Sequence, residues 1–322
     1  MTTGMTVLVT GANGWIGQAL CARLRREGVD VRAAIRKEGA GTRTGVETGV
    51  ETRYIIVGDI GADTDWSPAL AGVDTVVHLA ARVHQMRETA PDPLAAYRQT
   101  NVDATRKLVR DAARCGVRRF VFLSSVKVMG ECSPVGQPFR EADMPQPQDH
   151  YGRSKFEAET ALWQEAGAME AVVLRPPLVY GPGVRANFAA LLRAVRQGWP
   201  LPVGSVDARR SLVALDNLVD ALCVAMRHPR AAGEVFFVSD GQDLSVADLV
   251  RMLAQAMHRA PRIVPVPVEL LHCAGWCAGK AAAVERLCSP LQVDSTKLRT
   301  MLGWIPPLSL EEGLRQTVEG TE

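Results

Sequence analysis

Tyr151 and Lys155 stand four residues apart in a segment whose pattern predicts a helix. Positions i and i+4 share one helix face, so the Lys155 ammonium can lie near the Tyr151 phenol and favour its anion. A free phenol has a pKa of about 10 and is a poor base at neutral pH. Beside a fixed cation, a tyrosine can take or give the proton of a hydroxyl group while a nicotinamide carries the hydride. The same spacing also occurs by chance in helices, so this interpretation needs a companion motif.

A glycine-rich turn near the start of the chain supplies that companion. The stretch from Thr10 to Gly17 lies where a predicted strand ends and a helix begins. Gly11 permits a tight turn, Gly14 lets the backbone approach a pyrophosphate, and Gly17 allows close packing of the helix, whose N-terminus supplies N–H donors. With a strand before it and a helix after it, the turn predicts a dinucleotide site rather than a plain glycine turn. The expected cofactor contacts here are Gly11, Asn13, Gly14, Trp15, Ile16 and Gly17.

The end of the second predicted strand bears on the choice of dinucleotide. An NAD site usually has an acid there to bind the ribose hydroxyls, but this strand ends in Ala34-Ile35-Arg36-Lys37. Arg36, alone or with Arg32, could accept a ribose phosphate, which favours NADP or mixed use, although a solvated arginine at a strand end is common. We keep NAD as the first expectation and NADP as the alternative. Asp59, followed by Ile60, could bond the adenine amine or cap the next turn.

The composition excludes several classes of protein. Lys plus Arg total 37 against 35 for Asp plus Glu, which provides no field for nucleic acid or an anionic membrane. The seven cysteines are scattered, and Met1 to Thr6 lacks the features of a signal peptide, so we expect a reducing cytoplasm. An uninterrupted apolar stretch of about 18 residues is missing, which argues against a membrane-spanning helix. Cys273 and Cys277 are expected to pack in a core rather than to bind a metal, and no metal site is predicted.

The first half of the chain alternates short β-branched runs with helical stretches, which is typical of βαβ units. This predicts an α/β fold with a doubly wound parallel sheet. The expected strands are Thr6–Thr10, Val29–Ile35, Tyr54–Val57, Val73–Leu79, Arg119–Leu123 and Ala171–Leu174. The expected helices are Gln18–Glu27, Ala95–Cys115 and Ser154–Gly167. Gly39–Thr52 has no amphipathic period and is expected to be a mobile loop.

From Pro176 onward the chain gains prolines and shorter elements. We expect residues 1–175 to form the dinucleotide-binding domain and 176–322 to form mainly a smaller α/β substrate lobe, with some elements returning to the first domain. The expected helices here are Phe188–Gln197, Leu215–Met226, Ser245–His258 and Leu310–Thr317. Glu269–Leu287 is apolar and helical, and is expected to pack in the lobe or to form a dimer face rather than to contact a membrane.

Two serines follow the strand Arg119–Leu123. Ligands of an open parallel sheet bind at the carboxyl ends of its strands, so Ser125 is placed to contact the reacting hydroxyl or carbonyl. Ser124 is expected to line the nicotinamide pocket. The alternative for both serines is a turn or a helix cap.

In its motifs the chain resembles the extended short-chain dehydrogenase/reductase family, specifically the NAD(P)-dependent nucleotide-sugar epimerases and dehydratases. The resemblance spans nearly the whole length and implies a Rossmann domain. TGANGWIG matches the family's TGxxGxxG, His78-Leu79-Ala80-Ala81 its HxAA, Asn101-Val102 its NV, Ser124-Ser125 its hydroxyl strand end, and Tyr151-Gly-Arg-Ser-Lys155 its YxxxK. Five motifs in this order are specific.

The resemblance also implies roles for single residues. Ser125 would polarise the reacting oxygen, Tyr151 would be the acid/base, and Lys155 would hold the nicotinamide ribose. The other residues implied to line or brace the cofactor cleft are Leu79, Ala80, Ala81, Asn101, Ser124 and Pro177. The residues implied to bind the substrate diphosphate are Asn187, Arg209 and Arg286, and an arginine fork suits a diphosphate.

Departures from the family pattern bear on the reaction. Many of the dehydratases have an Asp-Glu pair after the catalytic hydroxyl residue, but here Val126-Lys127 follows, and valine cannot transfer a proton. We therefore expect a 4-epimerase of a UDP-hexose or UDP-N-acetylhexosamine, with a UDP-4-keto-6-deoxy-sugar 4-ketoreductase and a non-catalytic dinucleotide sensor as alternatives. Leu178 in place of an Asn, and Met129 in place of a Tyr, suggest a less polar sugar pocket. The resemblance implies a homodimer that pairs through the two long helices.

Overall fold

A seven-stranded parallel sheet forms the centre of the fold. The computed structural model describes residues 4–37, 52–83 and 91–320, so nearly all of the predicted loop 39–52 lies outside the described residues. The strand order is β10-β6-β5-β4-β1-β2-β3, with every neighbouring pair parallel. The strands are β1 (Thr6–Thr10), β2 (Asp30–Ile35), β3 (Arg53–Ile56), β4 (Thr75–His78), β5 (Arg119–Leu123), β6 (Glu170–Arg175) and β10 (Glu234–Phe237). The predicted doubly wound sheet is confirmed.

The strand order reverses beside β1. The chain runs from β1 outward to β2 and β3, then returns to place β4 on the other side of β1, with Thr10 paired to His78. In open α/β sheets, ligands bind at the carboxyl ends of the strands at such a reversal. The glycine-rich turn follows β1 directly, so the fold places it at this position.

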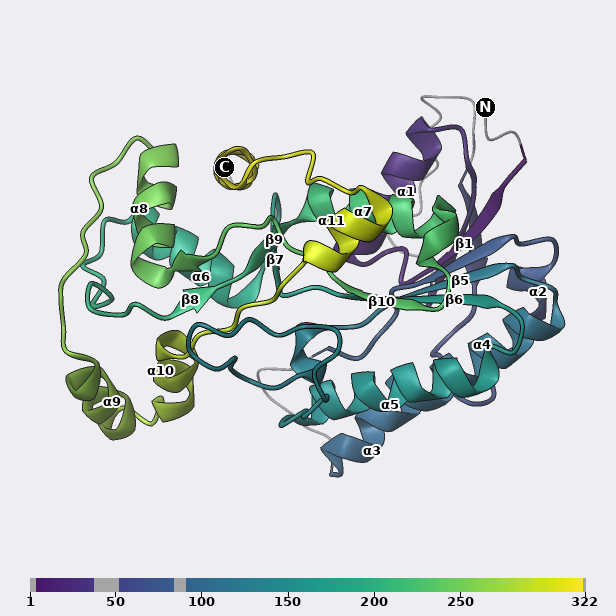
Figure 1. Ribbon diagram of the computed structural model, residues 1–322, viewed down its shortest axis with the longest axis horizontal. Coiled ribbons are helices and arrows are strands. Elements are labelled where there is room, and N and C mark those ends of the chain that lie inside the picture. Colours follow the sequence, from purple (N-terminus) through teal and green to yellow (C-terminus); the bar gives the residue numbers. More distant parts are fainter. Residues whose placement is uncertain (1–3, 38–51, 84–90, 321–322) are drawn as a thin grey trace.

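Helices cover both faces of the sheet (Figure 1). One face carries α1 (Trp15–Arg26), α7 (Leu215–Arg227) and α11 (Thr296–Leu302), whose apolar side chains share one core with the strands. The other face carries α2 (Ser67–Leu70), α4 (Ala104–Arg114) and α5 (His150–Glu165), which form the second core. Two apolar faces explain why the inner strands β1, β4, β5 and β6 are buried runs without alternation, whereas the edge strand β3 is partly exposed.

The predicted helix Ala95–Cys115 contains a change of winding. It consists of α3 (Pro93–Arg98), a five-residue π-helical turn η1 (Gln99–Asp103), and α4. A π turn within an α-helix is uncommon and often marks a functional site. Asn101, at the middle of this turn, is one of the predicted site residues.

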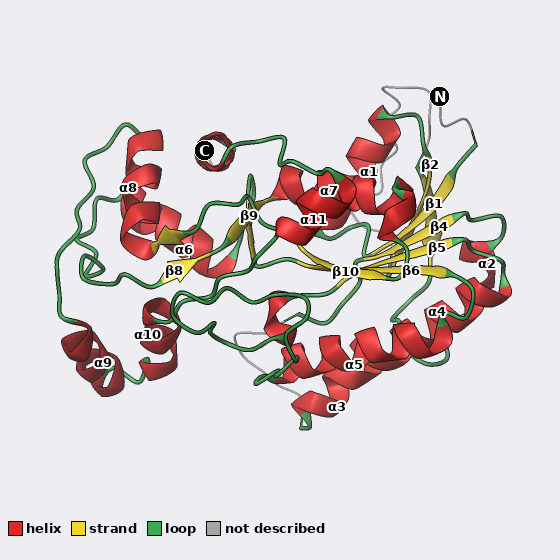
Figure 2. Cartoon of the chain, in the orientation of Figure 1, coloured by secondary structure: helices red, strands yellow, loops and turns green. Residues whose placement is uncertain are grey.

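The other elements of the second half of the chain, apart from β10, α7 and α11, build the lobe at the other end of the molecule (Figure 2). It contains the parallel pair β7 (Leu178–Tyr180) and β9 (Leu212–Ala214) and the antiparallel pair β8 (Arg209–Arg210) and β11 (Leu244–Ser245). The helices α6 (Ala186–Arg196), α8 (Val246–Ala256) and α12 (Leu310–Glu319) pack around a third apolar core. Two short 3₁₀ turns, η2 (Val126–Val128) and η3 (Pro229–Ala231), lie between longer elements.

The segment Glu269–Leu287 is helical, as predicted, but it is divided in two. The segment forms α9 (Val268–Cys277) and α10 (Ala281–Cys288), separated by a turn in which Gly279 has φ of +65°. The prediction that Cys273 and Cys277 pack in a core is wrong, because both are exposed. The inward face of α9 is formed by Leu271 and Gly275, and these residues lie on the opposite side of the helix from the two thiols.

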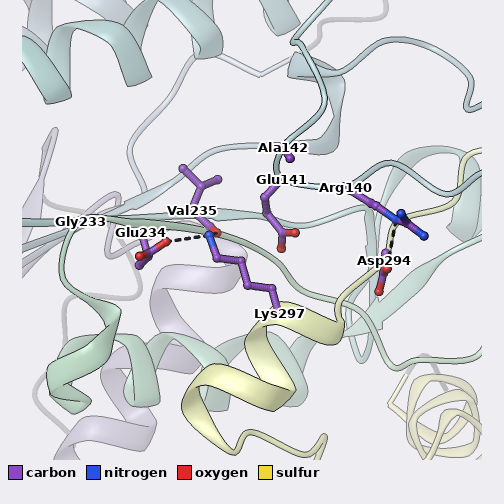
Figure 3. Close-up of a pocket in the computed structure, with 8 residues that line it drawn as sticks. All are labelled: Arg140, Glu141, Ala142, Gly233, Glu234, Val235, Asp294 and Lys297. Atoms are coloured by element: carbon purple, nitrogen blue, oxygen red, sulfur yellow. Dashed lines mark hydrogen bonds and ion pairs between the residues drawn. The ribbon is translucent and has the colours of Figure 1, made fainter.

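Strand β10 lies at one edge of the sheet, and acidic and basic side chains gather along it. Figure 3 shows the pocket there, with a volume of about 490 Å³. A Glu141 carboxylate oxygen accepts a hydrogen bond from the Phe237 N–H at 2.9 Å. The Lys297 ammonium bonds the Val235 carbonyl at 3.0 Å and pairs with Glu234 at 2.7 Å. The polar atoms of these side chains are therefore engaged with the strand, and the predicted site residues do not line this pocket.

Candidate functional site

The glycine-rich turn is shaped so closely that added side-chain atoms would clash. Gly11 has φ of +65°, and a Cβ there would lie 2.8 Å from the Ala80 backbone nitrogen. A Cβ on Gly17 would collide with the Gly11 carbonyl oxygen and lie 2.8 Å from the Ala12 Cα. Gly14 donates its N–H to the Gly11 carbonyl at 2.9 Å. The turn therefore brings the loops after β1 and β4 into direct contact. Its three glycines carry no side chain that could cover the backbone.

The N-terminus of α1 has no side-chain cap at Gly14. The first N–H groups of a helix need partners, and the partial positive charge there favours an anion, so a pyrophosphate fits this position. The Trp15 indole donates a hydrogen bond to the Pro182 carbonyl at 2.7 Å, which ties the turn to the loop after β7. Asn13 is exposed, and its carbonyl accepts a bond from Gln18 at 2.9 Å.

Arg36 and Asp59 form an exposed ion pair at the ends of neighbouring strands. The guanidinium and carboxylate are 3.4 Å apart. A carboxylate therefore does lie beside Arg36. It belongs to the loop after the third strand and not to the end of the second strand. Ile60, the next residue, packs against the core beneath α2 and α4.

The Ser125 hydroxyl lies beside the Tyr151 phenol and acts on the pKa of that phenol as a hydrogen-bonding group. Ser125 lies after β5 and caps η2 by accepting the Lys127 N–H at 3.2 Å. Tyr151 lies in the first turn of α5, where the Asp149 side chain caps the helix by accepting the Gly152 N–H at 2.6 Å. Burial raises the pKa of Tyr151, the Asp149 charge raises it further, and the hydrogen bond with Ser125 opposes both effects. The two hydroxyl groups expected to act together are thus adjacent.

Lys155 is buried on the inner face of α5, one turn after Tyr151. Its ammonium lies over the Phe122 ring, 3.9 Å from the ring centroid. Burial lowers the pKa of Lys155 to about 7, and the Glu159 carboxylate one turn later opposes this shift. The expected lowering of the Tyr151 pKa is not observed, because desolvation outweighs the neighbouring groups and the ammonium is held over Phe122.

Asn101 braces the site through its side-chain amide. It donates to the Ser154 hydroxyl at 2.8 Å and to the Arg82 carbonyl at 3.0 Å, and it accepts from the Arg82 N–H at 2.7 Å. Ser154 in turn donates to the Tyr151 carbonyl at 2.8 Å. The amide thereby connects η1, the loop after β4 and the first turn of α5. Both amide hydrogens are used within the protein, so Asn101 acts on the cleft by holding its walls.

The comparisons with known proteins agree with this geometry. The model of the NAD dependent epimerase/dehydratase family matches residues 7–239. A UDP-glucose 4-epimerase from Vibrio cholerae is 42% identical over 318 residues, covering 98% of this chain and 94% of that protein. This chain belongs to the NAD dependent epimerase/dehydratase family.

Two further proteins that this family member is similar to are named for activated sugars. An N-acetyl-alpha-D-glucosaminyl-diphospho-ditrans,octacis-undecaprenol 4-epimerase from Escherichia coli O157:H7 is 29% identical and covers 82% of each chain. The solved structure of MoeE5 in complex with UDP-glucuronic acid and NAD is 27% identical, with a TM-score of 0.78 and 98% of each chain covered.

In this family member the Ser124 side chain points away from Tyr151, unlike the side chain of Ser125. Its hydroxyl donates to the buried Glu159 carboxylate, which also pairs with Arg175 through two bonds of 2.6 and 3.0 Å. This network lies beneath the cleft, between α5 and the end of β6. Pro177, two residues after Arg175, is buried, while Leu79, Ala80 and Ala81 are half-buried at the end of β4.

The predicted substrate residues lie in the lobe. Asn187 is exposed in the first turn of α6, and Arg209 is exposed on β8, where it donates to the Asp243 carbonyl at 3.3 Å. Arg210 donates to the carbonyls of Arg286 and Ser289, the latter at 3.2 Å, and so brings β8 beside the end of α10. Arg209 and Arg286 are therefore on neighbouring elements.

The two departures from the family pattern differ in position. Leu178 is 48% exposed on β7. Met129 is buried, and its sulfur lies 3.2 Å from the Arg175 guanidinium. Leu178 can therefore alter a surface that a ligand reaches, whereas Met129 belongs to the network beneath the cleft.

Several residues of the site were missed at the level of sequence. Tyr97 of α3 meets the Tyr151 ring edge-on, with centroids 6.3 Å apart, and Thr10, His78 and Thr105 form a buried hydrogen-bonded chain behind the cleft. Thr10 and His78 belong to the TGxxGxxG and HxAA motifs, so the sequence gave a partial signal for these two residues. Thr105 and Tyr97 gave none, because their partners are distant in sequence.

Proposed function

We propose that this protein is an NAD-dependent 4-epimerase of a UDP-hexose or UDP-N-acetylhexosamine. The observation that carries the proposal is the adjacency of Ser125 and Tyr151, with Lys155 on the same helix as Tyr151, at the carboxyl ends of the strands where the glycine-rich turn also lies. Membership of the family and the relatives named for UDP-glucose and UDP-glucuronic acid support a nucleotide sugar as substrate.

The residues present fit NAD. The uncapped N-terminus of α1 and the cradle made by Gly11, Gly14 and Gly17 would hold the pyrophosphate, and a Cβ at any of the three would press on neighbouring backbone and reshape the turn. Asp59 would serve the adenosine end, and its pairing with Arg36 reduces the positive charge that a ribose phosphate would need. When bound, NAD accepts a hydride from a carbon of the sugar and returns it.

The side chains of the protein move the proton. Tyr151 would take the proton of the C4 hydroxyl, and Ser125 would hold the same oxygen by a hydrogen bond. The resting phenol is protonated, so Tyr151 would act as a base only when the Lys155 ammonium turns from the Phe122 ring towards it. The proton returns from Tyr151 to the oxygen after the 4-keto sugar has turned over, so the enzyme ends the cycle unchanged.

The loop after Ser125 argues against dehydration. Val126 is buried and has no titratable group. The Lys127 ammonium pairs with Glu131 and lies 3.5 Å from the Asp149 carboxylate that caps α5. Lys127 therefore supports the catalytic helix. The alternative that remains is a 4-ketoreductase, in which Tyr151 donates a proton once and reduced NAD(P) is consumed.

The test is turnover by Tyr151→Phe. Wild-type protein with NAD should interconvert UDP-glucose and UDP-galactose, or the N-acetylated pair, as measured by chromatography of the sugar nucleotides. Tyr151→Phe should bind NAD with unchanged affinity in a calorimetric titration and lose at least 100-fold in kcat, since general acid–base catalysis contributes about 10²–10⁴-fold. Unchanged turnover would contradict the assignment. Reaction only with a 4-keto sugar and NAD(P)H would favour the reductase.

We also propose a homodimer that pairs through α3, α4 and α5. Between these helices lies a groove of about 450 Å³, and the Trp163 side chain on α5 is 38% exposed. Bidentate Arg98–Glu157 and Arg110–Glu165 pairs hold the helices together beside it. Light scattering of the purified protein tests the proposal.

Within the described residues no helix is long and apolar enough to cross a membrane.

We place the enzyme in the cytoplasm. All seven cysteines are free, and Cys115, Cys132, Cys273 and Cys277 are exposed, which suits a reducing compartment. Fractionation of the cells that make it would test this location.

A further inference from the structure

The hydroxyl of Thr10 has a fixed proton direction. It accepts hydrogen bonds from the N–H groups of Leu79 and Ala80, both at 3.2 Å. Its own proton is therefore directed to the third partner, the His78 Nδ1 atom at 2.6 Å. Since Thr10 ends β1 and Gly11 begins the glycine-rich turn, this arrangement starts at the cofactor cradle itself.

The His78 ring continues this series of hydrogen bonds, with each group donating to the next one. With Nδ1 accepting, the neutral ring carries its proton on Nε2, which donates to the Thr105 hydroxyl at 2.9 Å. The ring is fully buried and stacks on Phe122, with centroids 5.7 Å apart. Burial and the nearby Lys155 charge lower the pKa of His78 to about 3, so the ring stays neutral throughout the physiological range.

Thr105 connects the His78 ring to the catalytic helix α5 through Asn101. Its hydroxyl donates to the Asn101 carbonyl at 2.7 Å, which fixes the π-helical turn. The Asn101 amide then donates to Ser154, and Ser154 donates to the Tyr151 carbonyl. Each donor and acceptor has one consistent role, and the chain of contacts runs without a gap from the cofactor turn to the backbone of Tyr151.

We propose that His78 and Thr105 are positioning residues that hold the Tyr151 helix in register with the cofactor turn. Neither residue contacts the reacting atoms, and both act through Asn101. The kinetic part of this inference rests on the proposed epimerase function. The structural part, a locked ring with its proton on Nε2, does not.

The kinetic test compares two buried threonines. Thr105→Val removes the hydroxyl at nearly constant shape, and Thr105→Ser keeps it. Thr317→Val is the matched control, because Thr317 is also fully buried and donates to a carbonyl four residues earlier at 2.7 Å, but in α12. We expect kcat to fall about tenfold or more in Thr105→Val, because small misplacements of catalytic groups cost up to about 10²-fold. The KM for the UDP-sugar should stay within about twofold, and Thr105→Ser should regain most of the loss.

Thermal unfolding separates positioning from stability. Both valine variants lose the hydrogen bond that the threonine donates to a carbonyl, and Thr105→Val also leaves the His78 Nε2–H without its acceptor. Both should therefore unfold at lower temperature, Thr105→Val by the larger amount. Equal kcat losses in the two valine variants, or no loss in Thr105→Val, would overturn the positioning role.

The second test needs no turnover. In protein labelled with ¹⁵N-histidine and bound to NAD, two-bond ¹H–¹⁵N correlation spectra report the tautomer, and the signal missing in His78→Gln assigns the ring. A neutral Nε2–H form that does not titrate between pH 6 and 8 is expected. A proton on Nδ1, or titration in that range, would overturn the inference even if the enzyme is an epimerase. If the wild-type protein catalyses no epimerisation but shows the expected tautomer, the proposed function fails and the locked ring stands.

Discussion

Replacing Gly17 by alanine should close the cofactor cradle. The added Cβ would collide with the Gly11 carbonyl oxygen and would lie 2.8 Å from the Ala12 Cα, where ordinary contacts begin at 3.4 Å. The turn and the helix must therefore separate by more than about 0.6 Å. Overpacking of this kind costs about 1–3 kcal/mol of folding free energy. Because all the atoms in the way are backbone, no side chain can rotate to relieve the clash.

The effect should be larger on NAD binding than on folding. The separation moves the N-terminus of α1 away from the position that the pyrophosphate would occupy, so we expect NAD affinity to fall at least tenfold in a calorimetric titration. Gly61→Ala is the control, because its Cβ would have no atom within 4 Å and its φ is not positive. Wild-type NAD affinity in Gly17→Ala, measured on folded protein, would refute the assignment of this turn as the cofactor site.

Two further predictions concern the buried charges of α5. The pKa of Lys155 is lowered to about 7, against about 10.4 for an unfolded chain, so between these values the unfolded chain binds one more proton and the cofactor-free protein gains stability as pH rises, by up to about 1.4 kcal/mol per pH unit. Lys155→Met should remove this part of the slope in urea titrations at pH 7, 8 and 9, and an identical slope in both proteins would disprove it. Glu159→Gln removes one partner of the buried pair with Arg175 and should cost about 3–5 kcal/mol of unfolding free energy. Glu165→Gln, at the exposed pair with Arg110, should cost less than about 1 kcal/mol, and similar losses in both variants would contradict the role of burial.

The strands were the most predictable part of the fold. Thr6–Thr10 and Arg119–Leu123 were predicted with the observed bounds, since each is a short buried apolar run ending in polar residues. The first helix was placed three residues too late, because its first turn contains Trp15 and Ile16 and has no capping side chain. The spacing of apolar residues in a sequence indicates well which residues are buried. The ends of a helix depend instead on local hydrogen bonds.

The parts that failed depend on contacts between distant segments. The break after Cys277 could not be read from an apolar run, because period alone does not show where a chain reverses. The π-helical turn at Asn101 is held by bonds to Arg82 and Ser154, and the direction of the Lys155 ammonium is set by Phe122 on a strand far away in sequence. The residue types of the site were therefore readable, but the partners that orient them were not.

The acidic and basic side chains along β10 have a consequence for assembly. An open edge strand offers its N–H and C=O groups to any strand that approaches, and this is the usual route to aggregation. Here the Phe237 N–H is already bonded to Glu141 and the Val235 carbonyl to Lys297. A second chain could extend the sheet at this edge only by breaking bonds to a carboxylate and an ammonium. Copies of this enzyme are thus steered away from joining sheet to sheet at the β10 edge. On this side of the molecule, the helical faces are left for contacts that can close on themselves.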